Sequence, residues 1–82
     1  MLTEYINAAM SRAHYQILPE NEGFFGEINL LKGVWSNSET LEKCRDELRE
    51  VLEEWIIFGL KNDCFIPVID NIDLNLIVKR AA

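Results

Sequence analysis

The stretch that decides the fold runs from residue 14 to residue 58 and reads HYQILPENEGFFGEINLLKGVWSNSETLEKCRDELREVLEEWIIF. Its first half contains two short apolar segments, separated by a polar loop with Pro19 and Gly23. Its second half passes a turn at Gly33 and continues as one long, acidic, amphipathic segment. This order is typical of a β-hairpin followed by a helix, so the sequence predicts a small α+β domain.

The strands are predicted from alternating side chains and turn residues. Residues 14–18 would form the first strand and residues 24–30 the returning strand, with Gly26 as a candidate bulge. The loop between them ends at Gly23, which can adopt the positive φ that such loops often need. Residues 34–35 would form a third short strand that leads into the long helix.

Two helices are predicted from a period of 3.6 residues. Residues 3–13 carry one apolar stripe, with Thr3 as the candidate N-cap. A long helix should begin near the capping candidates at residues 38–40. After it, alternating apolar residues at 72–78 predict a last strand. The apolar stripe of the long helix comprises Leu41, Cys44, Leu48, Val51, Leu52, Trp55 and either Phe58 or Gly59.

Composition and charge restrict the classes of function. The chain has 82 residues, of which 49% are hydrophobic, and this predicts one ordered domain that spans residues 1–82. Fourteen acidic and 8 basic side chains give a net charge of -6. The only basic cluster is Lys79-Arg80, so we expect no direct contact with nucleic acid. An acidic chain suits a basic protein partner, and charge that serves only solubility is an equally good interpretation.

The cysteines and the apolar runs indicate a cytoplasmic protein. Cys44 and Cys64 do not have the spacing of a metal motif, and Cys44 is expected to be a buried free thiol. The N-terminal segment carries Glu4 and Arg12 and lacks the apolar run of a signal peptide. No run is long enough to span a bilayer, so no membrane contact is expected.

No arrangement of residues predicts a catalytic, metal or cofactor site. His14 is the only histidine, and no nucleophile pattern accompanies it. Most carboxylates fall on the solvent side of the long helix, and the strands contribute only Glu27 and Asp73 to any two-metal site. We therefore expect a protein that is not an enzyme, with a residual nuclease based on Glu27 and Asp73 as the weakest alternative.

Five apolar residues are candidates for contact with a partner or with a second copy. Residues 55–58 are apolar on all sides of the predicted helix, and a monomer of this size is too small to bury all four side chains. Trp35 lies in an edge segment, where tryptophan often anchors an interface, whereas Trp55 could equally pack in the core. We expect a homo-oligomer, a dimer or a tetramer. The candidate interface residues are Trp35, Trp55, Ile57, Phe58 and Phe25.

The segment from Tyr15 to about Phe58 resembles the HicB antitoxin family. The resemblance implies a partial ribonuclease-H-like fold, with a three-stranded antiparallel sheet, one helix and a further strand, without the catalytic carboxylates of the nuclease. Asn29 stands where a proline is usual, and a helix precedes the first strand, as in short stand-alone variants. The matching features are the strand at 15–18, Gly23-Phe24, the strand ending at Ile28, the turn Leu31-Lys32-Gly33 and the helix start at 38–42.

The resemblance also implies a function. HicB proteins neutralise HicA-type toxins, which are small basic ribonucleases that cut mRNA, so an antitoxin that binds such a toxin is the first hypothesis. Many family members bind their operator through a C-terminal DNA-binding domain, for which the sequence up to Ala82 leaves no room. The alternative is an orphan HicB-like homo-oligomer of unknown regulatory role without a toxin partner.

Overall fold

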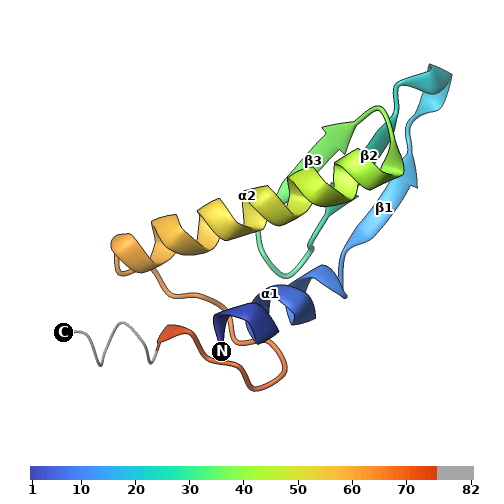
Figure 1. Cartoon of the computed structure of the whole chain (residues 1–82). Coiled ribbons are helices and arrows are strands. Elements are labelled where there is room, and N and C mark those ends of the chain that lie inside the picture. The colour runs from blue at the N-terminus through green and yellow to red at the C-terminus, as the bar shows by residue number, and fades with distance from the viewer. Residues whose placement is uncertain (76–82) are drawn as a thin grey trace.

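The computed structural model describes residues 1–75. Its elements are α1 (Leu2–Met10), β1 (His14–Ile17), a short 3-10 helix η1 (Pro19–Asn21), β2 (Phe24–Glu27), β3 (Trp35–Ser38) and α2 (Leu41–Lys61). The sheet lies beside the first half of α2, α1 lies beside its middle, and the segment after α2 runs along its second half (Figure 1). The predicted α+β class, with an N-terminal helix, a three-stranded antiparallel sheet and a long helix, is confirmed.

The sheet has the order β1-β2-β3, and both pairs are antiparallel. Gly26 pairs with Tyr15 on one side and with Ser36 on the other, in an unbroken register, so the predicted bulge at Gly26 is wrong. Instead, the missing side chain makes room for the helix, because a Cβ at position 26 would lie 3.1 Å from the Cys44 sulfur. The third strand begins at Trp35 and continues to Ser38, further along the chain than predicted.

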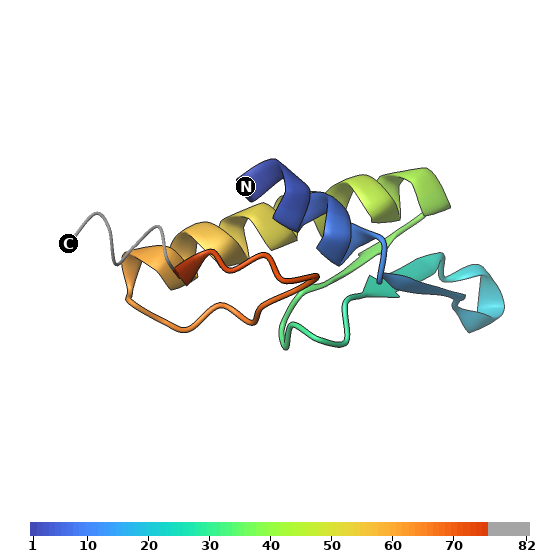
Figure 2. The same cartoon turned by 90° about the horizontal axis from the view of Figure 1, so that it is seen from below.

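One face of the sheet is covered by α2 and the other is open (Figure 2). On the covered face, Ser36 is buried and its hydroxyl donates a hydrogen bond of 2.7 Å to the Cys44 carbonyl. Because side chains alternate along a strand, the residues on either side of Ser36, Trp35 and Asn37, point to the open face. The same alternation places Phe25 on the open face.

The long helix begins where the sequence predicts. Thr40 is its N-cap, and the Thr40 hydroxyl accepts a hydrogen bond of 3.1 Å from the Lys43 N–H. One predicted stripe position, Leu41, is wrong because its side chain is exposed, and of the two alternatives Phe58 and Gly59 it is Gly59 that is buried. The buried stripe follows an almost strict spacing of four residues and consists of Cys44, Leu48, Leu52, Ile56 and Gly59.

The first helix is shorter than predicted and begins one residue earlier. Met1 is the N-cap, without a side-chain cap, so the predicted role of Thr3 is wrong. After Met10 the chain forms a turn in which the Ala13 N–H donates a hydrogen bond of 3.1 Å to the Met10 carbonyl, and β1 follows this turn. The buried residues of α1 are Tyr5, Ile6 and Ala9.

The predicted C-terminal strand is not confirmed. Residues 72–75 form no strand, and residues 76–78 of the prediction lie outside the described residues. The chain instead makes a tight turn in which Ile69 and Ile72 exchange backbone hydrogen bonds of 2.8 and 3.3 Å. Ile69 and Leu74 are buried in the core. The alternation of apolar and polar residues in this stretch therefore comes from individual buried side chains and not from a strand.

The core lies between α2, α1, the sheet and the segment that follows α2. Among the described residues, no helix combines the length and apolar character needed to cross a membrane. The buried cluster consists of Tyr5, Ile6, Ala9, Ile28, Leu31, Val34, Leu48, Leu52, Ile56, Ile66, Ile69 and Leu74.

Candidate functional site

Two of the predicted interface residues meet on the open face of the sheet. Phe25 on β2 and Trp35 on β3 are stacked, with ring centroids 5.9 Å apart and an interplanar angle of 25°. Trp35 is 55% exposed although its ring is large and apolar. An exposed stacked pair of this kind offers a flat apolar contact surface at little cost in side-chain entropy.

The other three predicted residues lie on the second half of α2 and separate into two groups. Ile57 and Phe58 are 57% and 67% exposed, whereas Trp55 is half-buried against the core. The segment after α2 adds two exposed apolar side chains, Phe65 and Val68, which the sequence analysis missed.

The solvent side of α2 carries a row of carboxylates. With 3.6 residues per turn, five of them lie opposite the buried stripe, and all are exposed. Ile57 falls on the same side, at the end of the row. We call this surface the acidic ridge; it consists of Glu42, Asp46, Glu50, Glu53 and Glu54.

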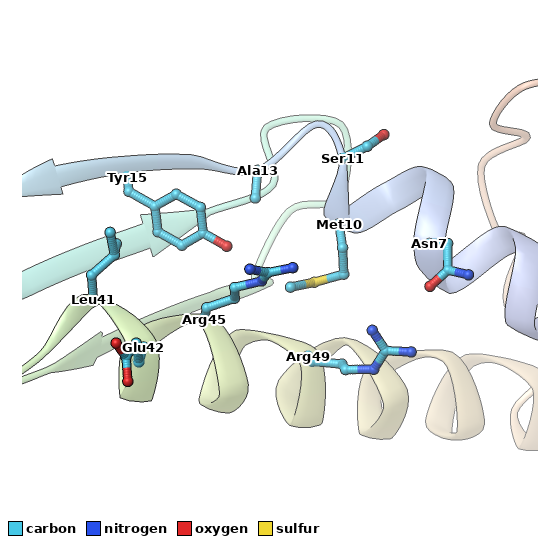
Figure 3. A pocket seen from close by; sticks show the side chains of 9 residues that line it. All are labelled: Asn7, Met10, Ser11, Ala13, Tyr15, Leu41, Glu42, Arg45 and Arg49. Atoms are coloured by element: carbon cyan, nitrogen blue, oxygen red, sulfur yellow. The ribbon is translucent and has the colours of Figure 1, made fainter.

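A groove of about 480 Å³ separates α1 and β1 from the first half of α2 (Figure 3). Its apolar wall is formed by side chains that include Met10 and the ring of Tyr15, and two arginines of α2, Arg45 and Arg49, extend into it (Figure 3). The lining residues are Asn7, Met10, Ser11, Ala13, Tyr15, Leu41, Glu42, Arg45 and Arg49.

The two arginines of the groove differ in their surroundings. The Arg49 Nε lies 3.6 Å from a Glu53 carboxylate oxygen, whereas Arg45 has no ion pair among residues 1–75. Burial raises the pKa of Tyr15, and the positive charge of Arg45 acts in the opposite direction. A guanidinium beside an apolar wall can bind a carboxylate with two parallel hydrogen bonds. The sequence signal for this groove was Arg45 and Arg49, two arginines four residues apart on one helix.

The residues considered for metal or thiol chemistry do not come together. Within residues 1–75, no three His, Cys, Asp or Glu side chains are grouped as metal ligands. The Asp73 carboxylate accepts a hydrogen bond of 2.9 Å from the Asn75 N–H, which is a structural role. Both cysteines are free thiols, with Cys44 buried as predicted and Cys64 exposed.

Comparisons with known proteins agree with this fold. No curated protein matches the chain significantly. A crystal structure of TTHA0281 from Thermus thermophilus superimposes with a TM-score of 0.82 at 34% sequence identity, covering 89% of this chain and 96% of that chain. A family model described as UPF0150-like matches residues 4–67, which include α1, the whole sheet and α2. The chain therefore belongs to the UPF0150-like family.

Proposed function

We propose that this chain is an antitoxin-type protein that binds and neutralises a HicA-type mRNA-cleaving toxin in the cytoplasm. The proposal concerns binding and assigns no catalytic step, cofactor or direct contact with nucleic acid to the chain. It is supported by the UPF0150-like match, which covers the segment that resembles HicB.

The observation that carries the proposal is the acidic ridge. Its carboxylates are exposed along one side of a rigid helix, and complementary charge raises the rate at which a basic protein docks. Ile57 at the end of the ridge supplies an apolar anchor, which is the kind of residue that contributes most to binding energy when a partner covers it. A ribonuclease held on this surface would lose access to RNA.

Charge reversal on the ridge tests the proposal. The variant Asp46→Lys/Glu50→Lys should lose capture of a HicA-type toxin, because both carboxylates face the solvent. The matched control Glu20→Lys/Glu22→Lys changes the net charge equally in an exposed loop outside the acidic ridge, and it should capture the partner like the wild type. Equal loss in both variants would show only an effect of net charge and would contradict the assignment of the ridge.

The second candidate function is an orphan HicB-like homo-oligomer with a regulatory role. The stacked pair Phe25–Trp35 favours it, because an exposed aromatic surface on a sheet is often covered by another subunit. Trp35→Lys should lower the molar mass in solution if this surface joins copies, and light scattering measures that mass directly.

A further inference from the structure

The outer edge of β1 has backbone groups that the sheet does not use. The Leu18 N–H donates to the Gly23 carbonyl at 2.8 Å, so residues 18 and 23 are a hydrogen-bonded pair of the β1–β2 ladder. Hydrogen-bonded pairs alternate along an antiparallel ladder, so the even-numbered residues of β1 bond to β2. The N–H and C=O groups of Tyr15 and Ile17 therefore point to the free edge.

This edge is only four residues long, but it lacks the other features that keep edge strands apart. All four residues of β1 are exposed, and the Ile17 side chain is 79% exposed. Protective edges usually carry lysine, proline or a bulge, whereas β1 reads HYQI and pairs regularly with β2. An exposed, regularly paired edge without lysine, proline or a bulge is suited to accept another strand.

Only one two-fold symmetric register uses all the free groups. Setting Tyr15 opposite Tyr15 of a second copy would place Ile17 opposite Ala13, whose N–H already donates to Met10. Setting Ile17 opposite Ile17 would place Tyr15 opposite Pro19, which has no N–H. Setting Tyr15 opposite Ile17 pairs every free N–H and C=O of both residues.

Charge and side chains agree with the last register. It places Arg12, whose guanidinium also forms an ion pair with Asp70 of its own chain, beside the acidic loop of the other copy, which contains Glu20 and Glu22. It also sets Ile17 of each copy against the Tyr15 ring of the other, a cross-strand pair of the stabilising kind. We propose that β1 joins two copies of this chain into a symmetric dimer with a continuous sheet, in which Tyr15 faces Ile17 of the second copy.

The dimer places α2 of both copies on one face of the joined sheet and the Phe25–Trp35 pairs of both copies on the other. The acidic ridge lies on the side of α2 that faces away from the sheet, so pairing through β1 leaves it accessible. The dimer therefore does not depend on the proposed antitoxin role. Loss of dimerisation would leave toxin capture unchanged, and loss of toxin capture would leave dimerisation unchanged.

Disulfide trapping tests the register. In a Cys64→Ser background, the thiol of Gln16→Cys would face the same thiol of the second copy in a non-hydrogen-bonded pair, whose Cα separation of about 4.5 Å permits a disulfide. Mild oxidation should give a covalent dimer. Ile17→Cys in the same background would face Tyr15 and should stay monomeric on a denaturing gel. Absence of the Gln16→Cys dimer, or equal trapping of both variants, would overturn the register.

Dissociation measured by light scattering over a dilution series tests the edge itself. Ile17→Pro removes an N–H that points away from β2, so the intrachain ladder is kept, and circular dichroism verifies the fold. The dissociation constant should rise about tenfold or more, since each copy loses a hydrogen bond to the other. Ile17→Thr keeps the N–H and should have a smaller effect. A wild-type monomer at every concentration, or a dimer that withstands Ile17→Pro and is lost in Trp35→Lys, would overturn the proposal.

Discussion

Gly23 and Gly33 have nearly the same backbone conformation in different surroundings. Their φ angles are +98° and +90°, but a Cβ at Gly23 would lie 2.3 Å from the Ser38 carbonyl oxygen, whereas a Cβ at Gly33 would meet nothing within 4 Å. We predict that Gly33→Ala costs roughly 1–2 kcal/mol of the free energy of unfolding, from the positive φ alone. Gly23→Ala should cost about 2–4 kcal/mol, because backbone must also move. Urea unfolding measures both, and equal costs would contradict the predicted clash.

The Asn75 side chain bonds to the backbone of Ile66, as a neighbouring strand would do. Its amide accepts a hydrogen bond of 2.8 Å from the Ile66 N–H and donates one of 2.8 Å to the Ile66 carbonyl. Asn75→Ala should lower the free energy of unfolding by about 1–3 kcal/mol, because the backbone N–H and C=O of Ile66 both lose their partner and the Ile66 side chain is buried. Asn62→Ala removes an exposed amide that donates to the Phe58 carbonyl, and it should cost less than about 1 kcal/mol. Urea unfolding of the two variants checks the difference.

Single residues could be predicted from the sequence where their role is local. Thr40 was recognisable as a cap because the partner of its hydroxyl, the Lys43 N–H, is three residues away. Asn75 was not, because its partner is nine residues away and only the fold brings the two together. Arg45 was missed for the same reason, since its position beside Tyr15 depends on how α2 crosses β1.

At the scale of elements, one buried phenol joins α1 to the segment after α2. The Tyr5 hydroxyl donates a hydrogen bond of 2.6 Å to the Pro67 carbonyl, and burial raises the pKa of Tyr5 from 10.0 to about 12. Between these two values the unfolded chain releases a proton that the folded chain keeps, so stability falls as pH rises. The wild type should lose up to about 2 kcal/mol over this interval through Tyr5.

The variant Tyr5→Phe isolates this contribution. It should be less stable near neutral pH by about 1 kcal/mol, through the lost hydrogen bond. Its stability should decline less between about pH 10 and about pH 12, because position 5 no longer titrates. Urea unfolding across this range gives both quantities, and parallel pH curves for the two proteins would contradict the role of Tyr5.

The elements differ in how well their pattern predicts them. The apolar spacing of α2 repeats over 21 residues, and it predicted most of the buried face, except for Leu41, which is exposed, and Ile56, which was not named. The stretch from Ile72 alternates apolar and polar residues like a strand, but only individual side chains such as Leu74 are buried in the core. No local sequence signal distinguishes such a segment from a strand. The third strand was predicted too early in the chain because residues 36–38 are polar and do not show the alternation of apolar and polar side chains that marks a strand. Of these three residues only Ser36 is buried.

At the scale of the whole molecule, the candidate surfaces were predictable only in part. Phe25 and Trp35 could be named from the sequence, but their stacking follows from the β2–β3 register. Ile57 and Phe58 were identified because no helix can bury apolar residues on all sides against one small core. The free edge of β1 and the arginine groove required the arrangement of elements, which composition and periodicity do not encode.

The central claim is that this chain blocks a ribonuclease by covering it with the acidic ridge. The most direct measurement is RNA cleavage by the HicA-type toxin that the proposal assigns to this chain, with increasing amounts of the folded chain added. Cleavage should stop once the two proteins are equimolar, and Asp46→Lys/Glu50→Lys should leave cleavage running. Cleavage that continues in the presence of excess folded wild-type chain would contradict the account.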